Sequence, residues 1–143
     1  MPASPEDTRP AEGPQIEETD RFSPRFERGG LIPCITIDAD RGDVLMMAWM
    51  NEEALRLTLE TGFAHYWSRS RQTIWRKGET SGATQRVVEL RTDCDQDVVL
   101  LRAAVGSRAG TCHTGRKACF YRSVPLGAGP IERRFEPFEG PDD

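Results

Sequence analysis

Two short runs decide the fold, LIPCITID at residues 31–38 and VLMMAWM at residues 44–50. Both are rich in the apolar, β-branched and aromatic residues that favour β-strands. The turn-forming residues DRGD at 40–43 lie between them. The sequence therefore predicts an antiparallel hairpin, with Cys34 as a small buried residue of its first strand.

One helix is predicted, at about residues 51–61. Asn51 can cap its first turn, and the two glutamates that follow suit the positive end of the helix dipole. Leu55 and Leu59 are four residues apart and therefore share a face of this helix. Gly62 supplies the residue that ends the helix.

Further strands are predicted at residues 63–69, 73–76, 84–92 and 98–105, and the run at 119–124 is compatible with a last strand. The predicted fold class is therefore α+β and strand-dominated, with a small mixed or antiparallel sheet. Proline, glycine and acidic residues dominate both ends of the chain. We expect a disordered or loosely packed tail at 1–28, one folded domain at 29–124 and a C-terminal tail at 125–143.

The bulk composition indicates one small cytoplasmic protein. The chain has 143 residues, 37% of them apolar, which leaves room for one domain with a core. No apolar run approaches the length of a membrane span, and residues 1–7 lack the basic and apolar regions of a secretory signal. We therefore expect a cytoplasmic protein without a membrane partner, whose four cysteines serve as thiols or metal ligands.

The net charge of −4 is distributed unevenly along the chain. Residues 65–122 carry eleven Lys and Arg against five Asp and Glu, a local charge of +6, so the remainder carries −10. A basic half favours a small anionic ligand such as a phosphate ester. A nucleic-acid partner is not expected, because the whole chain is acidic and no nucleic-acid motif accompanies the charge.

The loop KGETSG at residues 77–82 could bind such an anion. Its hydroxyl groups and backbone amides, with Arg76 or Lys77 beside them, could cradle a phosphate. A polar turn without a ligand explains the same composition equally well. A Walker phosphate loop is excluded, since its glycine-lysine-hydroxyl order is absent.

Three cysteines and three aspartates are candidate metal ligands. The soft donors, suited to zinc, are Cys94, Cys112 and Cys119; the hard donors, suited to magnesium, are Asp93, Asp95 and Asp97. A zinc ion held by three protein groups keeps its fourth position for water, and zinc-bound water ionises near neutral pH to a strong nucleophile. The three cysteines therefore predict a metal-dependent hydrolase. Ordinary buried thiols and a solvated acidic turn are the alternatives.

The orientation of the aspartates and the roles of the two histidines also bear on this site. In an extended segment the three aspartates would point to one side, with Cys94 and Gln96 on the other. His113 is either a fourth ligand that closes a structural zinc site or a group that transfers a proton. His65, between aromatic residues, is more typical of a half-buried strand position.

Five motifs follow one another along the chain: VLMMAWMN at 44–51, YWSRSR at 66–71, WRKGETSG at 75–82, DCDQD at 93–97, and CHTG at 112–115 continuing to residues 119–120. Together they resemble the phosphoribosyl-AMP cyclohydrolases of histidine biosynthesis, over about residues 31–124. Five motifs in the family's order are far more specific than any one of them. Two positions depart from the family pattern: Ala83 stands where a polar residue is usual, and Ala109 stands where the family tends to have glycine, with Gly110 one place later.

The resemblance implies hydrolytic opening of the adenine ring of 1-(5-phosphoribosyl)-AMP, between N1 and C6, to the formimino-carboxamide ribotide. It also implies zinc on the three cysteines, magnesium on the three aspartates, and an intertwined pseudo-barrel homodimer whose zinc sites draw cysteines from both chains. His113 is the candidate for catalytic proton transfer. The candidates for the two substrate phosphates are Arg69, Arg71, Arg76, Lys77, Thr80 and Ser81.

Two other functions compete with this interpretation. A zinc-stabilised module that binds an anionic partner would need a closed four-ligand site that includes His113. A nucleobase deaminase is disfavoured, because the His/Cys-x-Glu and Pro-Cys-x-x-Cys arrangement is missing.

Overall fold

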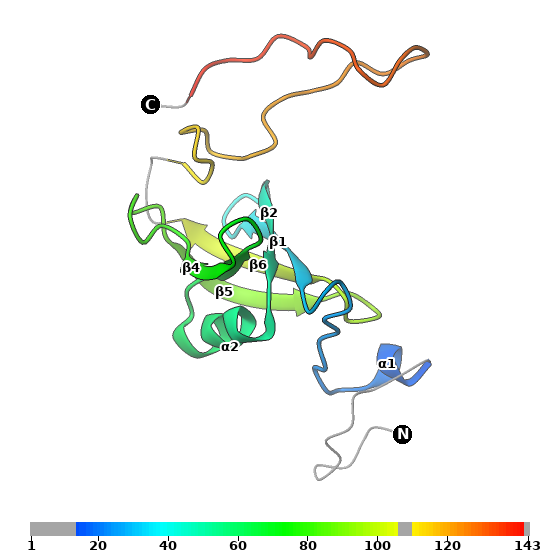
Figure 1. Ribbon diagram of the computed structural model, residues 1–143, viewed down its shortest axis with the longest axis vertical. Helices are drawn as coiled ribbons and strands as arrows, with labels where there is room; N and C mark the ends of the chain where they lie inside the picture. The colour runs from blue at the N-terminus through cyan, green and yellow to red at the C-terminus, as the bar shows by residue number, and fades with distance from the viewer. Residues whose placement is uncertain (1–13, 106–109, 142–143) are drawn as a thin grey trace.

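The computed structural model describes residues 14–105 and 110–141, whose arrangement is shown in Figure 1. Within these residues one sheet holds six strands in the order β4-β3-β2-β1-β6-β5. β1 and β6 run parallel, and the other neighbouring pairs are antiparallel. The strands are β1 (Ile32–Asp38), β2 (Val44–Met50), β3 (His65–Ser68), β4 (Thr73–Arg76), β5 (Gln85–Thr92) and β6 (Val99–Val105). The strand-dominated class is therefore confirmed, and the sheet is mixed.

The predicted hairpin is confirmed as the centre of this sheet. β1 and β2 pair antiparallel, with Cys34 opposite Ala48. The Asp38 N–H donates to the Asp43 carbonyl across the turn (2.8 Å), and Gly42 takes the left-handed conformation there (φ 79°). Cys34 is fully buried as expected, and burial raises the pKa of its thiol to about 12.

The predicted helix is confirmed as α2 (Glu52–Thr61). Asn51 Oδ1 accepts a hydrogen bond from the Ala54 N–H (2.8 Å), which satisfies a free donor of the first turn. Gly62 ends the helix in the left-handed conformation (φ 78°), and its N–H donates to the Thr58 carbonyl (3.0 Å). Both helix ends follow the capping chemistry of the sequence.

The buried face of α2 includes only one of the two leucines that share a face. Leu55 is buried, but Leu59 is 56% exposed. Thr58 takes the inner position instead, because its hydroxyl accepts the His65 N–H (3.0 Å) and donates to the Ala54 carbonyl (2.9 Å). The periodicity of apolar residues cannot predict that a polar residue such as Thr58 is buried between helix and sheet.

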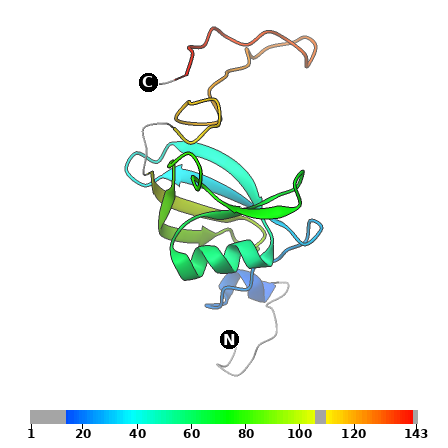
Figure 2. The same ribbon diagram turned by 60° about the vertical axis from the view of Figure 1, so that its left-hand side comes forward.

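The sheet curls into a half-barrel. The Ala64 N–H donates to the Gln85 carbonyl (3.0 Å), and the Val87 N–H to the Gly62 carbonyl (2.7 Å). These bonds join the segment before β3 to β5, although three strands separate β3 from β5 in the sheet. Figure 2 shows the curved sheet with α2 across its lower end.

A chain of hydrogen bonds between buried side chains crosses the interior. The Tyr66 hydroxyl donates to Gln85 Oε1 (2.6 Å) and lies 2.7 Å from Thr36 Oγ1. Gln85 Nε2 in turn lies 3.2 Å from Met46 Sδ. These four residues come from β3, β5, β1 and β2, so the network ties opposite walls of the half-barrel together.

The N-terminal segment is more structured than its composition suggests. Residues 14–28, assigned above to a disordered or loosely packed tail, contain the short helix α1 (Pro14–Glu18), and Ile16 is buried. Phe26 packs against the core, and the Arg25 N–H donates to the Gln96 carbonyl (2.8 Å). These contacts are long-range, so local composition could not reveal them.

The C-terminal segment, residues 110–141, runs away from the sheet without strand or helix (Figure 1). The possible last strand at 119–124 is therefore wrong. The Cys119 N–H donates to the Leu45 carbonyl (2.7 Å), but Phe120 and Val124 are 64% and 53% exposed. Strand propensity does not supply a pairing partner. Across the described residues, no helix is long and apolar enough to cross a lipid bilayer.

Tyr66→Phe should lower the free energy of unfolding by about 1–3 kcal/mol, because it leaves Gln85 Oε1 and the Thr36 hydroxyl buried without their partner. Tyr121→Phe, in the exposed C-terminal segment, is the matched control and should change it by less than about 0.5 kcal/mol. Chemical denaturation at fixed protein concentration measures both. Equal stability of Tyr66→Phe and the parent would contradict a stabilising role for the network.

Candidate functional site

A cavity of about 450 Å³ lies between β4, the loop that follows it and the start of the C-terminal segment. It is lined by Arg71, residues 75–81, residues 110–113 and Gly115. Five of the six predicted phosphate-binding residues, Cys112 and His113 therefore share one cavity. The exception is Arg69.

The loop at 77–82 is held in a tight turn. Gly78 has φ 82°, and a Cβ there would lie 2.3 Å from the Ala83 backbone carbon. The Gly82 N–H donates to the Gly78 carbonyl (2.9 Å), and the Ala83 N–H donates to Ser81 Oγ (3.2 Å). Thr80 and Ser81 remain exposed on the cavity side, while Ala83, one of the two family departures, is buried beneath the loop.

Lys77 connects this loop to the cysteine segment. Its amine donates a hydrogen bond to the Thr111 carbonyl and lies 5.7 Å from the centre of the Trp75 ring. Burial lowers the pKa of the Lys77 amine below its ordinary value, while negative charge on Cys119 and Cys112 acts to raise it. The cation therefore lies close to both thiols.

Cys112 and Cys119 lie close enough for each thiol to shift the pKa of the other. The Cys112 N–H donates to the Arg116 carbonyl (3.0 Å), and the Gly115 N–H donates to the Cys112 carbonyl (2.9 Å), so a compact turn brings the two thiols together. A Cβ at Gly110 would lie 2.4 Å from the Arg116 carbonyl oxygen, so this turn requires glycine at position 110. The other departure, Ala109, lies outside the described residues.

The two thiols have opposite electrostatic settings. Burial acts to raise the pKa of Cys112, but hydrogen bonds from Thr114, whose Oγ1 lies 3.1 Å from the sulfur, together with Cys119 lower it below its ordinary value. Burial of the Cys119 sulfur and the charge of Cys112 raise the pKa of Cys119 to about 11, although part of this residue is exposed. Cys112 is therefore the thiol that ionises first.

Two polar groups face the cavity beside this pair. His113 is exposed and lines the cavity, so its imidazole is open to a ligand. Thr111 Oγ1 is buried, and no hydrogen-bond partner for it is found among the described residues. Thr111 and Trp75 also line the cavity and were not predicted from the sequence; their positions next to Cys112 and Arg76 are the signal that could have indicated them.

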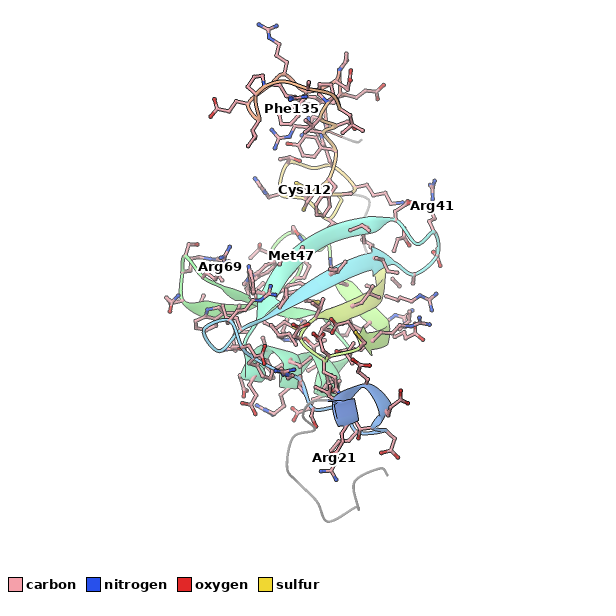
Figure 3. The ribbon with its side chains drawn as sticks, turned by 90° about the vertical axis from the view of Figure 1, so that its right-hand side faces the viewer. Arg21, Arg41, Met47, Arg69, Cys112 and Phe135 are labelled. Carbon is pink, nitrogen blue, oxygen red and sulfur yellow. The ribbon has the colours of Figure 1, made fainter. Side chains whose placement is uncertain are left out.

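Cys94 does not join the other two cysteines within the described part of one chain. It is exposed and precedes β6, whereas Cys112 and Cys119 follow β6. Figure 3 shows Cys112 beyond the end of the sheet, on the side toward the C-terminal segment. The predicted three-cysteine site is therefore incomplete in a single chain.

The three aspartates converge as predicted, but for a different reason. Asp93, Asp95 and Asp97 each place a carboxylate oxygen within 4.8 Å of the others. The segment is a turn and not an extended strand, because Gln96 takes a left-handed conformation (φ 59°) and its N–H donates to the Asp93 carbonyl (3.2 Å). Among residues 14–105 and 110–141 no other group of His, Cys, Asp or Glu meets the same geometric criterion.

Repulsion between these carboxylates perturbs their protonation. Hydrogen bonding to Asp95 and Asp93 raises the pKa of Asp97 to about 6. Partial burial acts to raise the pKa of Asp93, but hydrogen bonds from the other two carboxyl groups and from backbone N–H groups lower it. Asp93 Oδ1 accepts the N–H groups of Asp97 (3.0 Å) and Val98 (3.1 Å). One proton is therefore shared in a cluster that a cation would otherwise neutralise.

Arg69 lies in a second cavity of about 540 Å³ on the outer face of β2 and β3. That cavity is lined by residues 47–49, residues 67–71 and Trp75. The Arg69 guanidinium lies 5.0 Å from the centre of the Trp49 ring, a cation–π arrangement. Arg71 and Trp75 line both cavities. His65 lines neither; its Nδ1 lies 2.8 Å from the Phe63 carbonyl oxygen.

The donor sets fit the two metals that the sequence suggested. Cys112 and Cys119 present two sulfur donors, one of them with a lowered pKa, and sulfur donors suit zinc. The aspartates present only hard oxygen donors, which suit magnesium.

Comparison with known proteins identifies the family. The family model described as phosphoribosyl-AMP cyclohydrolase matches residues 46–121. Relatives of that name include one from Brucella canis, 58% identical over 131 residues that cover 92% of this chain and 91% of the relative. One from Brucella anthropi is 56% identical over 136 residues, covering 95% and 93%. One from Brucella abortus (strain 2308) is 63% identical over 108 residues, covering 76% and 91%.

The matched region contains the structural features described above. It includes the loop at 77–82, the aspartate cluster and all three candidate zinc cysteines. The order of motifs from which the resemblance was inferred is therefore confirmed independently, and the chain belongs to the phosphoribosyl-AMP cyclohydrolase family.

Proposed function

We propose that this protein hydrolyses 1-(5-phosphoribosyl)-AMP between N1 and C6 of its adenine ring, in histidine biosynthesis. Family membership supports the reaction. The observation that carries the proposal is the cavity in which His113 and Cys112 lie beside a basic, hydroxyl-rich loop. A nucleotide with two phosphates requires cations and a reactive centre close together, and this cavity offers both.

The substrate makes the chemistry tractable. Its ribosyl group on N1 makes the adenine ring cationic and C6 electrophilic. Water oxygen adds to C6 and becomes the carboxamide oxygen as the N1–C6 bond breaks, so it must lose both protons: one is transferred to N1 and the other is released. His113 is exposed to the cavity and is our choice for this proton transfer.

We propose zinc as the metal of this site, on Cys112 and Cys119 with Cys94 from a second copy. Zinc held there would act as a Lewis acid that makes water nucleophilic near neutral pH. The Thr114 hydroxyl, which lies 3.1 Å from Cys112 Sγ, would favour the thiolate that a metal needs. Reduced thiols fit the cytoplasmic location inferred from the sequence.

The phosphates have two groups of candidate partners. Arg76, Lys77, Thr80 and Ser81 surround the tight loop, and Lys77 also contacts the cysteine segment. Arg69 lies in the neighbouring cavity, which shares Arg71 with the first. We propose that both phosphates are bound along this continuous basic wall, with Trp75 between the two cavities.

We propose magnesium at the aspartate cluster. Three carboxylates within 4.8 Å repel one another, and hydrogen bonding to Asp95 and Asp93, with a smaller contribution from their charges, raises the pKa of Asp97. A hard divalent cation would relieve the repulsion. The cluster is remote along β6 from Cys112 in the same chain. In a dimer completed by Cys94, however, Asp93 and Asp95 would adjoin the zinc ligand of the partner's site.

Replacing His113 by alanine should remove turnover and leave zinc bound. We expect a loss of roughly a hundredfold or more, the usual contribution of a proton-transfer group. A ring-opening assay and metal analysis of the purified protein measure the two quantities. His65→Ala is the matched control and should retain turnover, because His65 lines neither cavity.

The same experiment separates this proposal from a zinc-stabilised binding module. Loss of zinc from His113→Ala would indicate a closed structural site and favour the module. The parent enzyme should lose ring opening when zinc is removed with a chelator and regain it when zinc is restored. Product formation that survives complete zinc removal would contradict the proposed chemistry.

Mixing Cys94→Ser with Cys112→Ser should restore activity that neither variant has alone. In a symmetric dimer with shared sites, each mixed dimer contains one site with no substitution and one with two. Random reassociation should therefore give about a quarter of the parent activity. The ring-opening assay after subunit exchange measures it. Continued inactivity of the mixture, with mixed dimers shown to form, would place all three cysteines in one chain's site.

Asp97→Asn should stabilise the protein at neutral pH in magnesium-free buffer. The pKa of Asp97 is about 6 when folded, against 3.8 as an isolated group, so ionisation costs folding free energy as pH rises through this range. The gain in unfolding free energy should be full above about pH 6 and absent below about pH 4. Denaturation at both pH values tests this, with Asp40→Asn as the exposed control; an equal gain at both pH values would refute repulsion.

A further inference from the structure

We propose that Gln96 is a positioning residue, which shapes the aspartate cluster by tying it to an N-terminal strap, defined here as residues 21–26. The proposal rests on the magnesium site put forward above. It assigns a role to Gln96, an uncharged residue between the candidate ligands Asp95 and Asp97. It also makes the strap part of the site, although the strap precedes residues 46–121, which the family model matches.

Gln96 makes three hydrogen bonds to the strap, all to backbone groups. Its Oε1 accepts the Ser23 N–H (2.6 Å), and its Nε2 donates to the Arg21 carbonyl (3.1 Å). Its own carbonyl accepts the Arg25 N–H (2.8 Å). Gln96 is 4% exposed, so both ends of its amide are satisfied inside the protein.

The chemistry of these contacts requires an amide. One end must accept a hydrogen bond and the other must donate one, which a carboxylate cannot do. Backbone conformation alone would favour glycine or asparagine at position 96, because its φ is 59°. Glutamine in this conformation is therefore explained by the reach of its side chain to the strap.

The strap fixes a turn that electrostatics would otherwise loosen. Asp95 and Asp97 flank Gln96, and an oxygen of each lies within 4.8 Å of the other and of Asp93, a distance at which ionised carboxylates repel. The turn is closed by Asp93 Oδ1, which accepts the N–H groups of Asp97 and Val98. Anchoring Gln96 on both sides of its amide restricts the turn before a cation arrives, so less free energy is spent on ordering the ligands.

Ser23→Pro tests this coupling without touching the aspartates. It removes the N–H that binds Gln96 Oε1, whereas the matched control Ser23→Ala keeps that N–H. The probe is Mn²⁺, titrated with the full-length protein and detected by electron paramagnetic resonance. We expect Ser23→Pro to weaken Mn²⁺ binding roughly three- to tenfold, the range that one lost hydrogen bond implies, and Ser23→Ala to bind like the parent. Asp95→Asn identifies the aspartate site, because this variant should no longer bind Mn²⁺ and should leave the resonance of the free ion unchanged.

Hydrogen exchange in the metal-free protein provides a second readout. In Ser23→Pro the amides of Asp97 and Val98 should exchange faster, while those of β1 and β6 keep the parent's protection. Equal loss of protection in β6 would show that the strap only stabilises the fold, and would overturn the positioning role.

The outcomes separate this proposal from the metal site on which it rests. If Ser23→Pro binds Mn²⁺ like the parent and Asp95→Asn does not bind it, the role of Gln96 is overturned and the cation site remains supported. Absence of Mn²⁺ binding in the parent overturns both. Weaker binding in Ser23→Pro alone, with local loss of protection at Asp97 and Val98, supports the proposal.

Discussion

The length of β6 is the constraint on which the account of the site depends. Cys94 and the aspartates precede this strand, and Cys112, His113 and Cys119 follow it. Seven residues of strand span roughly 23 Å, so the two sets of ligands begin at opposite ends of one rigid element. The chain can bring two thiols together at one end but cannot supply the third from the other. The second copy of the chain that we propose would resolve this separation, because its own β6 could run in the opposite direction.

Backbone bonds hold both ends of β6 in the half-barrel. At its start, β6 pairs with β5 from Val99 opposite Thr92, immediately beside the aspartate turn. Toward its end, it pairs with β1 in parallel as far as Ala103. The Tyr66 network then ties β1 to β3 and β5 across the interior. The candidate site therefore lies on loops and turns that extend from a rigid sheet, as binding residues commonly do.

The elements that follow local rules could be predicted from the sequence. Two apolar runs separated by turn-forming residues indicated the hairpin, and Asn51 and Gly62 marked the ends of α2, because capping depends on neighbouring residues alone. The 119–124 run had strand composition but no partner edge, and Leu59 had the right period but lost its inner position to Thr58. The link between Gln96 and Ser23 joins residues 73 positions apart, so no local pattern contains it. The grouping of the three cysteines as one ligand set stays a prediction; the fold adds that Cys94 precedes β6 whereas Cys112 and Cys119 follow it.

Zinc-edge anomalous diffraction from crystals of the purified protein tests the shared site most directly. The account predicts one strong zinc peak per chain, bonded to Cys112 and Cys119 of one copy and to Cys94 of a second copy, with His113 near but not bonded. A peak whose sulfur ligands all come from one chain, or one closed by His113, would contradict it.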